Sequence, residues 1–455
     1  MTFGVGRRPE RTAIDRHKSI VPRRRNRVVA LCVAICACSS PESTLVPTEP
    51  VSSVDSDRNI LLIIADDLGK DAMPGFAEGA VKPATPTLNS LATQGLTFTN
   101  LWVTPTCAPT RASIITGRHG FRTGVTRSGA ALSPAETTLQ AYIASASDRP
   151  YATAVVGKWH LARSASFNPE SMGIDYYAGI LSADIEDYYA WPLTADGVTT
   201  NETGYSTEVL TDLAIDWVQA QDDSWFLWLA YNAPHTPFHV PPAETHAQGT
   251  LPPYQQGVNG MPYYMAAIES MDFHIGRLLD SLSPAERAET TVIFIGDNGS
   301  PRQAVQAPYT ANTAKGSVYQ GGINTPMLVS GGQLRRQGTD ESVISSTDLF
   351  ATIAELAGVP VTQIHDSRSF SPLLSAPAPH RDYAFSGIEE AGAGTWTTAR
   401  GDRFKLIVRP NGDEEMFDLL ADPYERTDLI QLGLNPTQAT ARADLVAWLN
   451  GLGTS

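Results

Sequence analysis

The sequence predicts an α/β protein. It would have a large mixed, mostly parallel sheet sandwiched by helices, and a small C-terminal antiparallel-sheet subdomain with one helix. Continuous apolar runs rich in Ile, Val and Leu are typical of strands buried on both faces. Segments with helical periodicity alternate with these runs, as in a sheet covered by helices on both sides. After about residue 372, short strand-like pieces replace the longer runs.

Four buried strands and four helices make up the predicted main domain. The first strand, residues 59–65, reads NILLIIA and has no polar residue after its first position. The 36 glycines and 32 prolines predict many loops, and loops on a rigid sheet often carry function. The remaining strands are expected at 152–156, 225–230 and 291–296, and the helices at 86–94, 207–220, 263–281 and 346–357.

The chain divides into four predicted parts. Residues 58–372 would form the main domain and residues 373–455 the C-terminal subdomain, with a Ser-Ala-Pro-Ala-Pro linker at 375–379. Residues 1–38 are typical of a signal peptide, and residues 39–57, rich in Ser, Pro, Thr and Val, of a flexible tether. The C-terminal strands are expected at 383–387, 395–399, 404–408 and 415–418, and the closing helix at 437–449.

The N-terminus predicts export. Basic residues end at Arg27, and the apolar run 28–38 is about half of the ~20 residues that a membrane-spanning helix needs. Residues 35–38, Ile-Cys-Ala-Cys, resemble a bacterial lipoprotein cleavage box in which Cys38 would be lipidated. We therefore expect a bacterial protein that is periplasmic or anchored to the membrane as a lipoprotein. The alternative is that this run is a buried segment of the folded body.

Charge and cysteine content narrow the function. Residues 1–37 carry nine Lys or Arg against two acidic residues, so the net charge of −15 leaves −22 on the remainder. A body this acidic argues against nucleic-acid binding. Three of the four cysteines lie in the predicted signal peptide, which leaves Cys107 alone in the body. An exported body with one thiol has no intrachain disulfide, and the thiol calls for another explanation.

Two carboxylate-rich pairs follow predicted buried strands. Asp66 and Asp67 come directly after the strand 59–65, and Asp297 and Asn298 directly after the strand 291–296. Ligands of open α/β sheets bind beyond the carboxyl ends of the strands. Four hard oxygen donors at two strand ends suit Ca²⁺ or Mg²⁺ rather than Zn²⁺. Alternatively, each pair caps a turn or a helix start, a common role of Asp and Asn.

The sequence pattern of residues 106–118 predicts a short helix whose N-terminal end binds an anion. Pro109 suits the first turn of a helix and Gly117 suits its C-terminal end. Cys107 and Arg111 are four residues apart and share one face. Free N–H groups at a helix start and an arginine fork both bind tetrahedral oxyanions. The alternative is a buried cysteine that only fills space.

Three further segments place basic residues near strand ends. Lys158 and His160 follow the strand 152–156 and point to one side of an extended segment. His235 lies between two prolines just after the strand 225–230, and a fixed histidine is a typical general acid or base. We interpret His239 as structural. For Lys158 and His160, the ordinary alternatives are a surface lysine and a core histidine. Lys315 begins a glycine-rich run and could add a further cation, although a single lysine near glycines is weak evidence.

In this order, the motifs resemble those of the type I sulfatases of the alkaline phosphatase superfamily. The resemblance extends from about residue 58 to residue 430, and the Cys-x-Pro-x-Arg stretch followed by Thr-Gly-Arg is its most specific part. It identifies residues 58–372 as a catalytic sulfatase domain. The motifs are Asp66-Asp67, Cys107-Ala-Pro-Thr-Arg111, Gly157-Lys158-Trp159-His160, Pro234-His235, Asp297-Asn298-Gly299 and Lys315-Gly316.

The resemblance implies a modified cysteine as nucleophile. In that family the motif cysteine is oxidised to formylglycine by a formylglycine-generating enzyme, which would be a partner during maturation. The aldehyde hydrate has two hydroxyls, of which one attacks sulfur and the other later expels sulfate as the carbonyl re-forms, so that one difficult reaction becomes two easier ones. A thiolate nucleophile would leave an adduct with no comparable exit.

The remaining roles follow from the same resemblance. One Ca²⁺ per chain would be held by Asp66, Asp67, Asp297 and Asn298, with the modified side chain of Cys107 as a further ligand. Arg111 would stabilise the hydrate, and His160 would take its proton when sulfate leaves. Lys158 and Lys315 would bind sulfate oxygens, and His235 would protonate the leaving alcohol.

Some residues depart from the family pattern, and some questions stay open. Thr110 stands where Ser is common, and Gln320 and Asn324 where Glu and Arg are frequent, which affects supporting contacts rather than the core chemistry. The substrate would be a sulfated small molecule or glycan. A phosphodiesterase or phosphonate monoester hydrolase and a non-catalytic carbohydrate-binding relative remain alternatives. Residues 175–177 and 186–191 would form either an aromatic substrate wall or part of the core.

Overall fold

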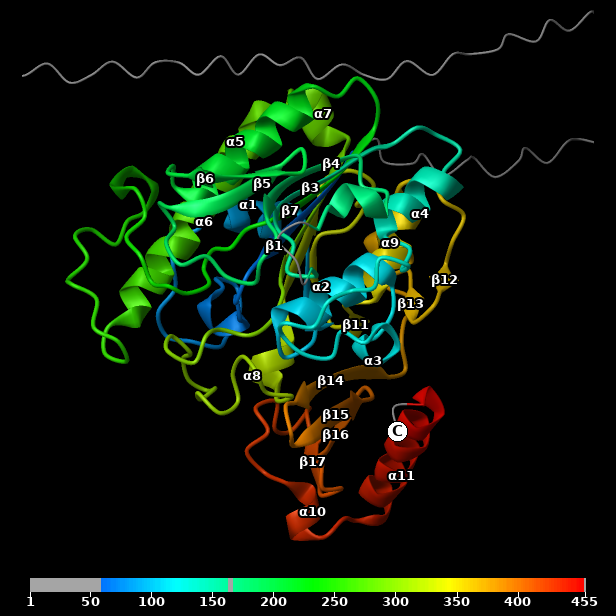
Figure 1. Cartoon of the computed structure of the whole chain (residues 1–455). Coiled ribbons are helices and arrows are strands. Elements are labelled where there is room, and N and C mark those ends of the chain that lie inside the picture. Colours follow the sequence, from blue (N-terminus) through cyan, green and yellow to red (C-terminus); the bar gives the residue numbers. More distant parts are fainter. Residues whose placement is uncertain (1–58, 163–166, 454–455) are drawn as a thin grey trace, which may run out of the picture. The chain divides into compact units, whose positions relative to one another are not determined.

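The computed structural model describes residues 59–162 and 167–453 (Figure 1). The predicted signal peptide and tether lie outside these residues. Eleven strands form one large sheet, in which β11 (Ile344–Ser345) pairs with β2. The order of the others is β10 (Gly338–Asp340), β2 (Leu96–Trp102), β9 (Asn324–Ser330), β8 (Thr290–Gly296), β1 (Asn59–Ala65), β7 (Trp225–Ala230), β3 (Ala152–Lys158), β4 (Tyr176–Ile180), β5 (Trp191–Ala195) and β6 (Val198–Glu202).

The centre of the sheet is parallel. Strands β8, β1, β7, β3 and β4 all run in one direction, so their carboxyl ends meet at one edge. Strands β9 and β5 are antiparallel to this central group, on its two sides. The four predicted main-domain strands are thus β1, β3, β7 and β8, and the predicted fold class is confirmed. The prediction omitted β2, β4–β6 and β9–β11, most of which are short or interrupted by polar residues.

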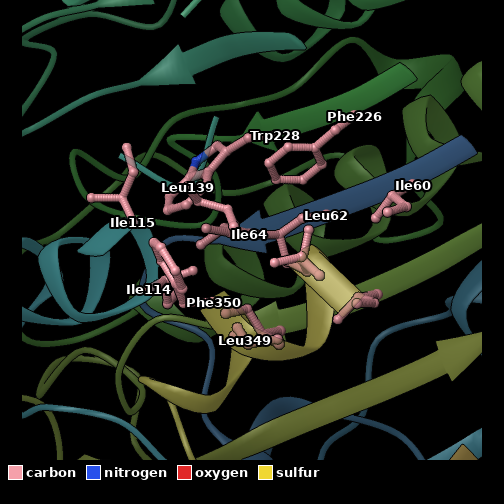
Figure 2. Packing of buried hydrophobic residues seen from close by; sticks show 14 of the residues in the cluster. Ile60, Leu62, Ile64, Ile114, Ile115, Leu139, Phe226, Trp228, Leu349 and Phe350 are labelled. Carbon is pink, nitrogen blue, oxygen red and sulfur yellow. The ribbon is translucent and has the colours of Figure 1, made fainter. Parts of the chain in front are cut away.

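Helices cover both faces because alternate residues of each strand point to opposite sides. Ile60, Leu62 and Ile64 of β1 contribute to the core on one face, where Figure 2 shows them beside side chains of three helices and β7. Leu61 and Ile63 face the opposite core. The first core includes α2 (Cys107–Thr116), α4 (Leu139–Ala146) and α9 (Asp348–Leu356), and the second includes α1 (Pro86–Gln94), α5 (Ser206–Gln219) and α6 (Gly260–Ser281).

The C-terminal subdomain is a four-stranded antiparallel sheet whose strands pair in chain order. The long helix α11 (Pro436–Leu452) packs on it through Leu445 and Leu449, which share a core with Leu406 and Met416. The structure also contains the four-residue helix α10 (Leu429–Leu432), which was not predicted. The strands are β14 (Ala384–Glu390), β15 (Gly394–Arg400), β16 (Phe404–Val408) and β17 (Glu414–Asp418).

Polar contacts join this subdomain to the main sheet. Ser386 Oγ donates to the carbonyl of Val103 over 2.7 Å, and Lys405 Nζ donates to that of Val318 over 2.7 Å. Glu425 pairs with Lys405 and also accepts the main-chain N–H of Gln320, at 2.6 Å. Gln320 begins the short helix α8 (Gln320–Ile323), so a residue that departs from the family pattern is supported through its backbone.

Among the described residues, no helix has the length and apolar character that crossing a membrane requires.

Candidate active site

Two neighbouring strand ends hold four oxygen-bearing side chains. Ala65 of β1 pairs with Gly296 of β8, so the residues that follow them lie side by side. The main-chain N–H of Asp67 donates to Asp297 Oδ1 over 3.1 Å, and Asn298 Nδ2 donates to Asp67 Oδ1 over 2.8 Å. Asp66, Asp67, Asp297 and Asn298 are all buried. The predicted convergence of the two pairs is therefore present in the structure.

Helix α2 brings the predicted nucleophile to these carboxylates. Cys107 is its first residue, and Gly117 ends it in the left-handed conformation with φ 67°. Cys107 Sγ donates to Asp66 Oδ1 over 3.0 Å and lies 3.8 Å from Asp67 Oδ1. One turn later, Arg111 donates from Nε and Nη2 to Asp297 Oδ2, at 3.0 and 2.8 Å. The helix thus places one thiol and one guanidinium over both strand ends.

Two lysines add positive charge to the same cluster. Lys158 is the last residue of β3, and its Nζ lies 2.5 Å from Asp66 Oδ2. Lys315 reaches Asp67 from the loop before α8, with 2.7 Å between Nζ and Oδ2. Burial alone would raise the pKa of Asp66, but the charges of Lys158 and its basic neighbours hold it below its usual value. Three carboxylates and three cations, Arg111 included, therefore balance in charge.

His160 follows Lys158 in an unusual backbone conformation. Its φ is 59°, and Asp67 has a φ of 68°, whereas few residues other than glycine have a positive φ. Its Nε2 lies 3.3 Å from Ser128 Oγ, and its Nδ1 is buried without a hydrogen-bond partner among the described residues. Burial, and then the charges of Lys158 and Arg111, lower the pKa of His160 to about 2. The ring is therefore neutral near pH 7.

His235 lies on the loop after β7, at the edge of the carboxylate cluster. Its Nε2 is 3.7 Å from Asp67 Oδ2, and its Nδ1 lies 2.6 Å from the carbonyl oxygen of Thr236, which fixes the ring. The hydroxyl of Tyr188 donates to the carbonyl oxygen of His235 over 2.7 Å and so supports the loop. His239 stacks on Tyr188 with 3.6 Å between ring centroids, in agreement with a structural role.

Most of the aromatic residues that were left open belong to the core. Tyr177, Tyr188 and Trp191 are fully buried. Tyr189 is exposed, but its hydroxyl donates to the carbonyl oxygen of Val240 over 2.8 Å. These residues support the loops around the site rather than forming a wall within it.

The structure brings two further residues to the site that the sequence analysis did not single out. The carboxylate of Asp184 lies 3.4 Å from His235 Nε2 and 3.9 Å from Lys158 Nζ, and 62% of its side chain is exposed. It follows β4, a parallel strand that was not predicted, so its place at a strand end could not be recognised. Ser128 lies on a loop, and its contact with His160 depends entirely on tertiary structure.

The cluster fits a divalent cation. Ligand atoms of Asp66, Asp67, Cys107 and His235 all lie within 4.8 Å of one another, a set that contains His235 but not the predicted ligand Asp297. Asn298 Oδ1 is buried and lacks a hydrogen-bond partner among the described residues. Because a buried acceptor without a partner is costly, a cation at this oxygen would satisfy it. The carboxylate and amide oxygens are the donors that Ca²⁺ and Mg²⁺ prefer.

Comparisons with known proteins find named sulfatases among the similar sequences. The chain is 28% identical to the uncharacterized sulfatase YdeN of Escherichia coli over 379 residues, which cover 70% of this chain and 65% of YdeN. It is also 28% identical to mouse arylsulfatase G over 416 residues, which cover 78% of this chain and 76% of that protein.

Solved structures share the fold. The structure of Ps i-CgsB in complex with k-i-k-neocarrahexaose has a TM-score of 0.74 at 24% identity, covering 86% of this chain and 92% of that one. The phosphonate monoester hydrolase of Agrobacterium radiobacter has a TM-score of 0.66 at 19% identity, covering 87% and 95%. The sulfatase family model matches residues 58–359, about two thirds of the 455 residues. A match of this extent shows that the protein belongs to the sulfatase family of sulfuric ester hydrolases.

Proposed function

We propose that this protein hydrolyses sulfate monoesters of saccharides, with formylglycine made from Cys107 and with Ca²⁺ bound by Asp66, Asp67, Asp297 and Asn298. The observation that carries the proposal is the position of Cys107 Sγ, 3.0 Å from Asp66 Oδ1. The nucleophile position and the candidate cation ligands thus share one buried site.

The environment of Cys107 favours a modified side chain over a thiolate. Burial, and then the negative charges of Asp297 and Asp66, raise the pKa of the thiol well above its usual value. A protonated thiol is a weak nucleophile, since the thiolate is the reactive form. The aldehyde, when hydrated, supplies one hydroxyl for attack on sulfur and a second whose deprotonation lets sulfate leave. An oxidising maturation enzyme is the partner that this conversion requires.

The site's charges suit an anionic ester. The three buried carboxylates and the three cations of the cluster cancel, so a bound divalent cation together with the exposed carboxylate of Asp184 would leave a net charge of about +1 around the sulfate group. Such a cation supplies Lewis-acid polarisation of an oxygen ligand. Lys158, Lys315 and Arg111 are buried or nearly so, and fixed charges in a dry site stabilise a developing negative charge more strongly than in water.

Two histidines divide the proton transfers. His235 stands at the partly exposed edge of the cluster, where the leaving alcohol would depart, and its Nε2 is the atom that faces the cluster. We assign it to protonate the leaving oxygen. The buried Nδ1 of His160 has no hydrogen-bond partner among the described residues, and we assign this neutral ring to accept the proton of the second hydroxyl.

A sugar substrate is supported by the named relatives. One similar protein is the N-acetylgalactosamine-6-sulfatase of Homo sapiens, and the similar fold of Ps i-CgsB was solved with k-i-k-neocarrahexaose bound. The fold shared with a phosphonate monoester hydrolase supports the second candidate, a phosphonate or phosphodiester hydrolase. Both candidates would use the same cations, because the two substrate classes carry similar oxyanions.

Two measurements test the proposal. Peptide mass spectrometry of protein from a host with a maturation enzyme should show the mass of formylglycine in place of Cys107. Turnover of 4-nitrophenyl sulfate should exceed that of 4-nitrophenyl phosphate, bis(4-nitrophenyl) phosphate and a phenylphosphonate monoester. A clear preference for a phosphorus ester would reject the sulfatase assignment. An unaltered Cys107 thiol in fully active protein would reject formylglycine as the nucleophile.

We further propose that the chain is exported to the bacterial periplasm and anchored through a lipid at Cys38. The basic and apolar pattern of residues 1–38 supports this. Replacing Cys38 by Ser should move the protein from the membrane fraction to the soluble periplasm. Equal membrane association of the variant would contradict a lipid anchor at this residue.

A further inference from the structure

A cavity of about 430 Å³ opens beside the candidate active site. Its volume lies in the range of about 300–1,000 Å³ that is typical of small-ligand sites. It is lined by Thr106, Gly316 and Ser128 among others. Thr106 precedes Cys107, Gly316 follows Lys315, and Ser128 Oγ is 3.3 Å from His160 Nε2. The cavity therefore borders the reacting centre at three points.

The C-terminal subdomain completes this cavity. Ile388, Glu389 and Glu390 from β14 and Trp396 from β15 line one wall. Residues of the loop before α8 also line the cavity, and Figure 1 shows α8 beside the small sheet. A ligand in the cavity would therefore touch both parts of the chain.

Trp396 is held in place as an aromatic surface. The Arg409 guanidinium lies over the ring, 5.3 Å from its centroid, and the indole N–H donates to Glu390 Oε2 over 3.0 Å. The ring is half-buried and lines the cavity. A fixed indole with one polar edge suits a sugar ring, which has apolar C–H faces and a polar rim.

Arg302 differs from the other arginines near the cavity in its ion pairing with carboxylates. Arg127 lies 3.8 Å from Glu389, and Arg409 pairs with Glu415. Among the described residues, Arg302 has no carboxylate within ion-pair distance. Its Nε approaches the carbonyl oxygen of Lys315 at 3.4 Å.

The guanidinium of Arg302 also lies against the backbone next to Lys315. A Cβ atom built on Gly316 would be 3.4 Å from Arg302 Nη2, and the φ of Gly316 is +85°. The Arg302 guanidinium thus lies beside the backbone that follows the lysine assigned to sulfate. The Arg302 guanidinium therefore has N–H donors available for an anionic group of a ligand, because none of the described carboxylates pairs with it.

We propose that this cavity binds the sugar part of the substrate, with Trp396 against a ring and Arg302 against a second anionic group. The inference rests on the proposed function and narrows its substrate to a saccharide with at least two anionic groups. Glu389 and Glu390 offer acceptors for sugar hydroxyls on the same wall. A small aryl sulfate has neither a hydroxylated ring nor a second charge.

The test compares substrates within each variant. The probes are 4-nitrophenyl sulfate, N-acetylglucosamine 6-sulfate and N-acetylgalactosamine 6-sulfate, with the two sugars also joined to a uronic acid as disaccharides. The variants are Arg302→Gln, Arg302→Lys and Trp396→Ala. Arg335→Gln is the matched control, since Arg335 is exposed and its side chain donates only to two carbonyl oxygens among the described residues.

We expect the wild type to prefer a disaccharide to its monosaccharide. Arg302→Gln should lower the ratio of the two kcat/KM values by roughly tenfold to a hundredfold, because a charge-assisted hydrogen bond is lost. Arg302→Lys should restore part of the ratio. Trp396→Ala should lower the sugar-to-aryl ratio about tenfold. Arg335→Gln should leave both ratios unchanged.

Equal ratios in wild type and Arg302→Gln would overturn the inference. So would a wild type that cleaves 4-nitrophenyl sulfate but none of the sugars, and this result would leave the sulfatase chemistry intact. Failure of the modified enzyme to cleave any sulfate ester would instead reject the proposed function, and the inference with it.

Discussion

Cys107 and Asp66 meet across the candidate active site, with Sγ 3.0 Å from Oδ1, although 41 residues separate them in the chain. One begins helix α2 and the other follows strand β1. The contact places a buried thiol among carboxylates, where its pKa is raised and it is a weak nucleophile. This relationship supports the modified side chain that we propose for position 107.

Replacing Cys107 by Ala should abolish hydrolysis without unfolding the protein. We expect kcat to fall by at least about a thousandfold, because the nucleophile is lost. The melting temperature should change by only a few degrees, since one small side chain at a helix start is removed. Steady-state kinetics and thermal unfolding measure the two effects. Activity near that of the wild type would rule out position 107 as the nucleophile.

Removal of Ca²⁺ with EGTA should lower both activity and stability. Asp66, Asp67 and Asp297 are buried together, and the orphaned oxygen of Asn298 lacks a partner without a cation. A ligand present at about 100 times its Kd stabilises the folded state by about 2.7 kcal/mol. Calorimetry with and without EGTA, followed by re-addition of Ca²⁺, measures this. A melting temperature that EGTA does not move would argue against a bound calcium ion.

Replacing His235 by Ala should slow hydrolysis most for sulfate esters that have poor leaving groups. A general acid protonates the departing oxygen and contributes roughly a hundredfold to ten-thousandfold. An alkoxide of a sugar needs that proton, whereas 4-nitrophenolate leaves easily without it. We therefore expect a much larger loss of kcat/KM with sugar sulfates than with 4-nitrophenyl sulfate. Equal losses on both substrates would show that His235 acts in some other way.

Buried histidines should make the fold sensitive to acid. Burial lowers the pKa of His119 to about 4, and it does the same for His239 and His274. A histidine of the unfolded chain binds its proton near pH 6.5, so between pH 6.5 and 4 the unfolded state binds more protons than the folded state. The free energy of unfolding therefore falls as the pH falls through this window.

Substitution of His119 tests whether the free energy of unfolding falls with falling pH for this reason. It packs against Phe121 and Phe385, with ring centroids 5.8 and 4.9 Å away. Urea unfolding at pH 7 and at pH 5 measures how much the free energy of unfolding decreases between the two. This decrease should be smaller by about 1–2 kcal/mol in His119→Phe than in the wild type. A constant cost of repacking would not change this slope. The same slope in both proteins would contradict the assignment of a neutral, buried His119.

The buried pair of Lys405 and Glu425 should be needed for attachment of the C-terminal subdomain. Glu425→Gln leaves the ammonium of Lys405 buried without its partner, and breaking a buried ion pair typically costs about 3–5 kcal/mol. Adding Lys405→Met should recover part of this loss, because the unpaired charge is then removed. Urea unfolding of both variants tests the pair. A double variant less stable than Glu425→Gln alone would contradict this account.

The sequence by itself predicted the parallel centre of the sheet and the chemistry at its edge. Buried parallel strands are visible as continuous apolar runs, and Asp66 and Asp297 follow two of them directly. Because parallel strands end at one edge, residues after them converge whatever the length of chain between them. Cys107 and Arg111 could be related to each other because four residues span one helical turn.

Tertiary structure alone decided the surroundings of that edge. Asp184, Ser128 and Arg302 reach the site from loops, and no local pattern fixes where a loop lies. Trp396 could be assigned to a strand but not to a cavity wall, because its neighbours across the cavity come from the other part of the chain. Tyr188 could have been substrate wall or core until its buried position was known. Periodicity reports which face of an element is apolar, whereas the partner of that face is set by long-range packing.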